Sequence, residues 1–224
     1  MGSVVSHVWV NIVVALGEEA APLARAFGLR ARWSGGQGVA LYEGAICGLA
    51  TRLMVGGVGR SAAATAVGLL RGLAIGDERG SRSLWLSGGL AGHRARPLGQ
   101  VVLAATVHDA TRGRRFELLR EFATPCAVAD LETHDEVVHA YPLEDRAVEM
   151  EAAGFVAAAR RLGVSRGRVQ CLKVISDNAR APLRKRKPRL TRAQIEGYVA
   201  RLVPALGLLL PRWEAALRSD DADG

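Results

Sequence analysis

The 224 residues suffice for one large domain or two small ones, and a chain of this length buries most of its apolar surface when it folds. Hydrophobic residues make up 49% of the chain and charged residues 23%, the composition of an ordinary soluble globular protein. The net charge of +8 suggests an anionic partner, but lysine occurs only at positions 173, 185 and 187, so the excess of arginine indicates a coding bias more than a selected phosphate-binding face.

The first predicted unit is a buried strand followed by a helix. Residues 8–16 are largely apolar and β-branched, which is typical of a strand buried on both faces. Glu18 and Glu19 follow in a turn, and a helix is expected over residues 20–29, with Pro22 tolerated in its first turn. This order is the first half of a βαβ unit.

A glycine-rich turn is the main feature of the next segment. Short strands are expected between residues 30 and 55, and a small-residue helix from Ser61 to about Leu73. Before that helix, residues 56–60 have the sequence GGVGR, which lacks the Lys-Ser/Thr of a P-loop and the third glycine of a dinucleotide-binding turn. The turn serves either a ligand contact or close helix packing, and both remain open.

Three further strands are expected over residues 83–86, 101–105 and 126–131. The first leads into a small-residue loop at 87–92, and residues 111–123 are expected to form a solvated insertion. The pairs His108-Asp109 and His134-Asp135 are interpreted as polar loop pairs, with His134 the better candidate for a pocket residue.

Residues 148–153, with the sequence VEMEAA, place two carboxylates at the start of a predicted helix. The apolar stripe of this helix runs from Met150 to Leu162, and Gly163 supplies a stop. Glu149 and Glu151 would lie in the first turn, where free N–H groups and the helix dipole favour negative charge. Helix stability alone is therefore one explanation of the two acids.

The last third of the chain is expected to contain one more buried strand and a long helix. The strand covers residues 168–176 and delivers Asp177 at its end. After a basic run at 184–187, Thr191 and Gln194 form a capping box for the helix, which Pro204 is expected to kink.

Strands that alternate with helices predict an α/β fold: a single-domain three-layer sandwich whose central sheet is mixed, largely parallel and twisted, with helices on both sides. The domain is expected to span residues 1–224, with a disordered tail from 218. The extra short strands at 30–55 and 99–131 lie outside strict βα alternation, so some pairing should be antiparallel.

Carboxylates follow several of the predicted strands. In open α/β sheets ligands bind beyond the carboxyl ends of the strands, so acids from distant parts of the chain should converge there beside the glycine-rich segments. Paired carboxylates suit the cleavage of a glycosidic or N-glycosidic bond, in which one acid protonates the leaving group and another activates water. A second interpretation uses the same acids to hold a divalent metal. No cysteine or lysine stands out as a nucleophile, and Ser87 lacks a nucleophile elbow.

Five segments, in chain order, resemble the nucleoside phosphorylase/nucleosidase superfamily, most closely its methylthioadenosine/S-adenosylhomocysteine nucleosidase branch. The segments span nearly the whole chain; they are residues 15–19 (ALGEE), 55–60 (VGGVGR), 87–92 (SGGLAG) with 99–102 behind it, 148–152 (VEMEA) and 175–179 (ISDNA).

The resemblance implies a role for each matched position. Asp177 would be the general acid that protonates the departing purine, and Glu19 would activate the attacking water. Glu151 would bind the ribose hydroxyls and Met150 would pack under the sugar, while Ser176 would orient Asp177 and the base. Further substrate contacts are expected from Glu149, Gly59, Ser87, Ala91, Gly92 and His134.

The chain also departs from the family pattern. The family often stacks an aromatic residue on the base after the strand that here ends at Leu131, and His134 would take that place. The arginines that bind phosphate in the phosphorylases have no clear match, which favours water as the acceptor, although Arg60 remains a candidate for phosphate. A branch that acts on adenosyl groups attached to hopanoid lipids shares the pattern at 87–92. The resemblance further implies a homodimer, a small-molecule nucleoside as partner, no cofactor and no metal.

A non-catalytic module that binds nucleic acid or another anion through residues 180–192 is the alternative from another class, although no aromatic residue interleaves the basic ones. Cys47 and Cys171 lie in apolar runs and are expected to be buried and reduced. The apolar run at 8–16 is too short for a membrane span and has no basic start or cleavage site, so a cytoplasmic protein is expected.

Overall fold

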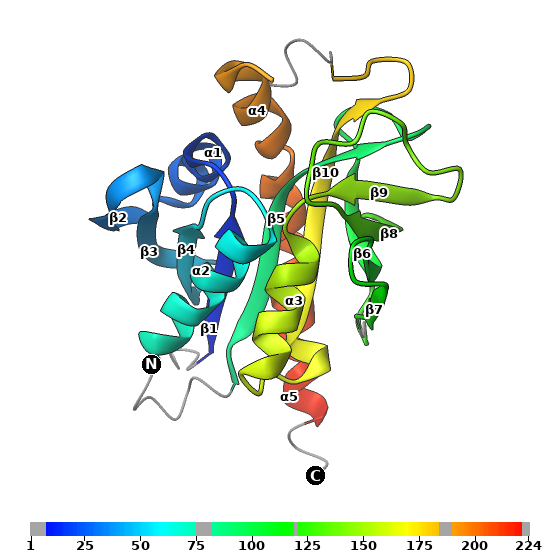
Figure 1. The fold of residues 1–224 in the computed structure, drawn as a ribbon. Helices are drawn as coiled ribbons and strands as arrows, with labels where there is room; N and C mark the ends of the chain where they lie inside the picture. The colour runs from blue at the N-terminus through cyan, green and yellow to red at the C-terminus, as the bar shows by residue number, and fades with distance from the viewer. Residues whose placement is uncertain (1–7, 75–81, 119–120, 184–189, 221–224) are drawn as a thin grey trace, which may run out of the picture.

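The computed structural model describes residues 8–74, 82–118, 121–183 and 190–220. The basic run at 184–187, expected to be a loop, lies outside these ranges. The strands are β1 Trp9–Val14, β2 Arg30–Ser34, β3 Ala40–Ile46, β4 Leu49–Val55, β5 Leu84–His93, β6 Val101–Asp109, β7 Arg114–Glu117, β8 Ala127–Thr133, β9 Arg146–Glu149 and β10 Val169–Asn178. The helices are α1 Gly17–Phe27, α2 Arg60–Gly72, α3 Ala152–Arg161, α4 Arg192–Val199 and α5 Leu202–Asp220 (Figure 1).

Strand β1 is the centre of the open part of the sheet. It pairs in parallel with β4 on one side and β5 on the other, and the edge continues antiparallel through β3 to β2. The predicted mixed α/β sheet is therefore confirmed, including the antiparallel pairing expected for the short strands at 30–55.

The other part of the sheet closes on itself. β5 pairs in parallel with β10, β10 pairs antiparallel with β6, β6 and β8 are parallel, β8 and β9 are parallel, and β9 returns antiparallel to β5. These five strands form a closed ring, with β7 added to β6 as an outer hairpin strand. The sequence patterns did not predict this closure, which depends on which distant strands become neighbours.

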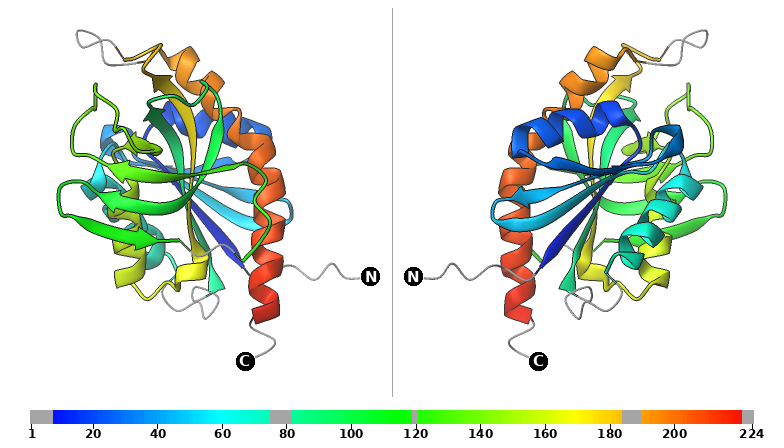
Figure 2. Two further views of the ribbon diagram at one scale, coloured as in Figure 1. Left: turned by 90° about the vertical axis from the view of Figure 1, so that its right-hand side faces the viewer. Right: turned by 90° about the vertical axis from the view of Figure 1, so that its left-hand side faces the viewer.

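Helices cover both faces of the sheet and make the three predicted layers (Figure 2). The alternation of β1 shows how: Val10, Ile12 and Val14 belong to one core cluster with residues of α1, α4 and α5. Val13 belongs to the second cluster, with residues of α2 and α3. Both faces of β1 are thus buried, as its continuous apolar sequence predicts.

Several strands are longer than predicted, and this changes where polar residues lie. Residues 87–92 are part of β5 and do not form a loop, because Gly88 to Gly92 remain paired with β10. Likewise Asp177 lies within β10, opposite Gly92. The segment 111–123 was expected to be a solvated insertion, but β7 within it pairs with β6, and Leu118 is buried.

Other local predictions need correction. Cys47 is exposed, because it occupies a two-residue hairpin turn between β3 and β4, where Cys47 and Gly48 both have positive φ (52° and 79°). Cys171 is buried, as predicted. The expected tail does not begin at 218, since α5 continues to Asp220 and Arg218 pairs with Glu214 one turn earlier; residues 221–224 lie outside the described ranges.

The C-terminal helix is divided in two. α4 begins at its Thr191–Gln194 capping box, as predicted, and ends at Val199; α5 starts at Leu202, which places Pro204 in a first turn where it is tolerated. By length and hydropathy, the stretch Arg192–Arg218 passes the test for a membrane-spanning helix. Its apolar stripe, including Val199, Leu206 and Trp213, is buried in the first core cluster, which accounts for that hydropathy.

Candidate active site

A cavity of about 540 Å³ opens at the carboxyl ends of β1, β9 and β10, beside the second half of β5. Six carboxylate residues line it: Glu18, Glu19, Glu136, Glu149, Glu151 and Asp177. Met150, Ser176, Ala91 and Gly92 line it as well, together with the aliphatic residues Val137, Val138, Leu183, Leu190 and Ile195. The expectation that acids from distant segments converge beyond the strand ends agrees with this geometry.

Glu19 is held by backbone N–H groups in the first turn of α1. Its Oε2 accepts hydrogen bonds from Ala15 N (2.8 Å) and Leu16 N (3.0 Å), and its Oε1 accepts one from Leu90 N (3.2 Å). Burial raises the pKa of the carboxyl group, and Lys173 and the N–H donors oppose this rise. A Cβ atom at Gly89, where φ is +135°, would lie 2.8 Å from Oε1, so glycine there leaves room for the carboxylate.

Lys173 is the only described lysine, and it lies in the middle of β10 with 1% of its side chain exposed. Its Nζ atom is 3.0 Å from Glu149 Oε2 and 3.7 Å from Glu151 Oε2. The carboxylates Glu149, Glu151 and Glu19 together raise the pKa of Lys173, against the opposing effect of burial. The ammonium therefore stays charged and supplies the positive charge that a divalent cation would otherwise bring to these acids.

Glu149 joins β9, α3 and Lys173. Its Oε2 accepts hydrogen bonds from Glu151 N (3.0 Å) and Ala152 N (2.8 Å), which are free N–H groups at the start of α3, and Thr133 Oγ1 donates to its Oε1. The expectation that Glu149 stabilises the helix start is thus confirmed, although Glu149 ends β9 and α3 begins only at Ala152. Glu149 is a structural anchor of the cavity wall.

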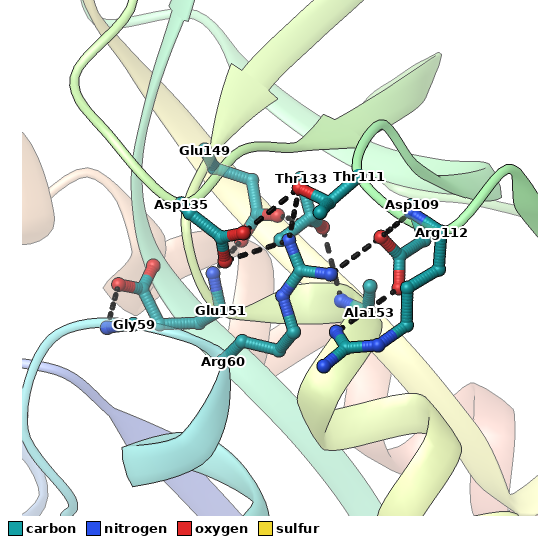
Figure 3. A network of polar contacts seen from close by, with 10 residues as sticks. All are labelled: Gly59, Arg60, Asp109, Thr111, Arg112, Thr133, Asp135, Glu149, Glu151 and Ala153. Carbon is teal, nitrogen blue, oxygen red and sulfur yellow. Dashed lines mark hydrogen bonds and ion pairs between the residues drawn. The ribbon is translucent and has the colours of Figure 1, made fainter.

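Glu151 is tied to the glycine-rich turn before α2. Its Oε1 accepts a hydrogen bond from Gly59 N at 2.9 Å (Figure 3). Burial is the main cause that raises the pKa of Glu151 to about 7; Lys173 and the Gly59 N–H oppose it, and the charges of Glu149 and Glu19 add to it. Glu151 therefore carries a proton part of the time near neutral pH, and it can both donate to and accept from a hydroxyl group.

Asp177 is bound by two hydroxyl groups. Ser176 Oγ donates to Oδ1 at 2.7 Å, and the Tyr141 hydroxyl donates to Oδ2. The β10 strand has a bulge between Ile175 and Asp177, opposite Ala91 and Gly92. Such an extra residue turns the strand locally, and here Asp177 lines the cavity.

Arg60, at the start of α2, is surrounded by acids (Figure 3). Its guanidinium contacts Asp109 Oδ1 at 2.5 Å and Asp135 Oδ1 at 2.8 Å, with Thr111 Oγ1 at 3.1 Å. Asp109, predicted to be part of a polar loop pair, is buried at the end of β6 because of this ion pair. Both terminal nitrogens of Arg60 are paired within the protein, and the side chain links the glycine-rich turn to the segment after β8.

Two predicted substrate contacts lie elsewhere. Ser87 is buried in the first half of β5, paired with Val13 and Cys171, because β5 runs on for six residues beyond it. His134 is not among the lining residues of the cavity, and its Nε2 is 2.7 Å from Glu132 Oε1. The next segment, with Val137 and Val138, lines the cavity in its place. Gly59 contributes through its N–H bond to Glu151.

Lys173 and Tyr141 were not predicted as site residues. A signal for Lys173 was present, because a single lysine within a buried apolar strand needs a buried counter-charge. Tyr141 has no local signal, since its position depends on how the segment between β8 and β9 folds back over β10.

The arrangement of strands and helices matches a known fold. The twisted mixed sheet with its five-strand ring and with helices on both faces is the nucleoside phosphorylase/nucleosidase fold, as the solved structures described below show. No protein-family model and no curated protein sequence matches the chain.

Particular solved structures share this fold over nearly the whole chain. An S-adenosylhomocysteine nucleosidase from Streptococcus pyogenes, in complex with 5-methylthiotubericidin, aligns over 93% of this chain and 99% of its own, with a TM-score of 0.67 and 20% identity. The futalosine hydrolase of Helicobacter pylori aligns over 95% and 98%, with a TM-score of 0.66 and 15% identity. A methylthioadenosine/S-adenosylhomocysteine nucleosidase from Colwellia psychrerythraea, in complex with adenine, aligns over 94% and 96%, with a TM-score of 0.65 and 19% identity. The fold expected from the sequence motifs is confirmed.

Proposed function

We propose that this protein is an enzyme that hydrolyses the N-glycosidic bond of a purine nucleoside, of the methylthioadenosine or S-adenosylhomocysteine type. The observation that carries the proposal is the meeting of Glu19, Glu151 and Asp177 in one cavity, from α1, the start of α3 and β10. Structures of the same fold are named as nucleosidases and as a futalosine hydrolase, which supports the same class of reaction.

In the proposed reaction, Asp177 gives a proton to the purine ring as the bond to the sugar breaks. This protonation neutralises the leaving group while positive charge develops on the sugar. Glu19 takes a proton from the attacking water, and the raised pKa of Glu19 makes it a stronger base. The remaining hydroxide oxygen of the water forms the new C–O bond to the sugar. In one reaction, therefore, one proton leaves Asp177 and one arrives on Glu19.

Glu151 is proposed to bind the sugar hydroxyls, with Met150 packing beside the sugar. A carboxyl group with a pKa of about 7 can accept a hydrogen bond in one protonation state and donate one in the other. The positive charge of Lys173 partly offsets the negative charges of Glu19, Glu149 and Glu151, which lie around the proposed sugar position.

Water is the proposed acceptor, and phosphate is disfavoured by the charges of the cavity. The arginine proposed as a phosphate ligand, Arg60, is paired with Asp109 and Asp135. Among the described lining residues Arg192 is a further cation, and it is paired with Glu196. A phosphate dianion would also lie among carboxylates, which repel it.

The experiment is a measurement of base release from a panel of methylthioadenosine, S-adenosylhomocysteine, futalosine and adenosine, with and without phosphate. We expect release without phosphate and a free sugar product. Asp177→Asn should reduce kcat about 10³-fold, within the range for loss of a general acid, while Asp130→Asn on β8, outside the cavity, should retain full activity. Strict dependence on phosphate would replace the hydrolase by a phosphorylase, and the absence of base release from any nucleoside would contradict both.

A further inference from the structure

Tyr141 belongs to the segment between β8 and β9, and its hydroxyl donates a hydrogen bond to Asp177 Oδ2. Ser176 Oγ occupies the other oxygen, Oδ1, at 2.7 Å. Each oxygen of the carboxyl group is thus held by one hydroxyl, from two different parts of the chain.

Tyr141 approaches Asp177 from outside the cavity. Asp177, Ser176 and Gly92 all line the cavity, whereas Tyr141 is not one of its lining residues. A Cβ atom at Gly92 would lie 2.5 Å from Asp177 Oδ2 and 2.8 Å from Tyr141 Cε1, so the absence of a side chain at Gly92 creates the space in which the two groups meet. A ligand in the cavity and Tyr141 can therefore contact Asp177 at the same time.

The two hydroxyls are the side-chain partners of Asp177 in the described part of the chain, and no ion pair to Asp177 is found there. The charged groups on the neighbouring elements are engaged elsewhere. On β10, Lys173 pairs with Glu149 and Glu151. On β5, His93 Nε2 is 2.8 Å from Asp145, and on α1 Glu19 accepts hydrogen bonds from backbone N–H groups.

The Tyr141 hydroxyl remains a donor at neutral pH. Burial and the neighbouring Asp177 both raise the pKa of Tyr141 above its ordinary value of 10.0. The hydroxyl keeps its proton and does not act as an acid itself.

We propose that Tyr141 is a positioning residue for the reaction: it holds Asp177 from behind and presents the acid group to the leaving base on the cavity side. This inference rests on the proposed function of Asp177 as the general acid. The transferred proton passes from Asp177 to the base, and Tyr141 keeps its own proton throughout.

The test is Tyr141→Phe in the full-length protein, with kcat, KM and the pH profile of kcat/KM measured on the best substrate. Tyr42→Phe is the matched control, because Tyr42 lies on β3 and does not line the cavity. In Tyr141→Phe, kcat should fall about tenfold, and KM should change less than about twofold, because Tyr141 lies outside the cavity. Loss of a donor to a carboxylate disfavours its charged form, so the basic limb of the profile should move about one unit to higher pH.

Three results distinguish the two proposals. An active wild-type protein whose Tyr141→Phe variant keeps the wild-type kcat and pH profile overturns the role of Tyr141 alone. A lower kcat with an unmoved basic limb, in a variant with the wild-type melting temperature, also overturns it, since a purely structural loss explains that result. A wild-type protein that releases no base overturns the proposed function and, with it, the inference for Tyr141.

Discussion

The two ends of the cavity hold their carboxyl groups by different means. At one end the lysine cluster, composed of Glu19, Glu149, Glu151 and Lys173, surrounds a buried ammonium with three acids. At the other end the hydroxyl clamp, composed of Ser176 and Tyr141, holds Asp177 by two neutral donors. A cation attracts the carboxylates around it through charge, whereas neutral hydroxyls orient a carboxyl group by hydrogen bonding. A buried charge therefore organises the carboxylates of the lysine cluster, whereas hydrogen bonds alone orient Asp177 in the hydroxyl clamp.

The largest effect is expected from Lys173→Met, which removes the cation of the lysine cluster and should lower the free energy of unfolding. It would leave buried carboxylates without their cation, and removal of one partner of a buried ion pair costs about 3–5 kcal/mol. We expect that loss in the free energy of unfolding at pH 7, measured by urea denaturation, and a smaller loss at pH 5, where the acids take up protons. The double variant with Glu149→Gln should recover part of it; a loss below about 1 kcal/mol would show that the cluster does not depend on the lysine.

The second prediction concerns the pH dependence that Glu151 adds to stability. Its pKa is about 7 in the folded protein and 4.5 ordinarily, so between these values the folded state binds more protons than the unfolded state. Stability should therefore fall as the pH rises from 4.5 to 7 and level off above, by about 3 kcal/mol for this group. Urea denaturation across this range should show that decline in the wild type, and Glu151→Gln should show a smaller decline, because Glu19, whose pKa is also raised, remains. Parallel pH profiles for the two proteins would contradict the raised pKa.

The third prediction changes the hydroxyl clamp without removing any of its polar groups. In Gly92→Ala the new methyl group meets Asp177 Oδ2 at 2.5 Å, so the carboxyl group must move away from the position that Tyr141 and Ser176 define. A displacement of about 1 Å costs roughly 100-fold in rate. We expect that loss in kcat for base release, with the melting temperature within a few degrees of the wild type. Unchanged kcat would show that the position of Asp177 is not critical.

The smallest effect on stability is expected from a substitution outside both the lysine cluster and the hydroxyl clamp. Gly68 is exposed in α2, and a Cβ atom there meets no atom within 4 Å. Gly68→Ala should stabilise the protein by up to about 1 kcal/mol, through helix propensity and reduced freedom of the unfolded chain, with unchanged kcat. Thermal unfolding and the base-release assay measure the two quantities, and a loss of activity would extend the site to α2.

The candidate acids could be predicted because each follows a recognisable local pattern. Glu19 follows an apolar strand, Glu151 starts a helix stripe, and Asp177 ends a buried strand. Their convergence follows from the rule that ligands bind beyond the carboxyl ends of parallel strands. Ser87 shows the limit of this reasoning: the strand end was placed seven residues too early, so a residue inside β5 was taken for a loop residue.

By itself, the sequence determined the alternation of strands and helices, the acids at the strand ends and the glycines beside them, because these depend on local periodicity and local backbone freedom. Only the tertiary structure decided the five-strand ring, the pairing of Lys173 with Glu149 and Glu151, the commitment of Arg60 to Asp109 and Asp135, and the bond from Tyr141 to Asp177. These contacts join residues far apart in the chain, and strand register and packing bring them together. The local sequence pattern predicts that an acid lies at the end of a strand. The protonation state and the orientation of that acid depend on residues far away in the sequence, which a local pattern cannot identify.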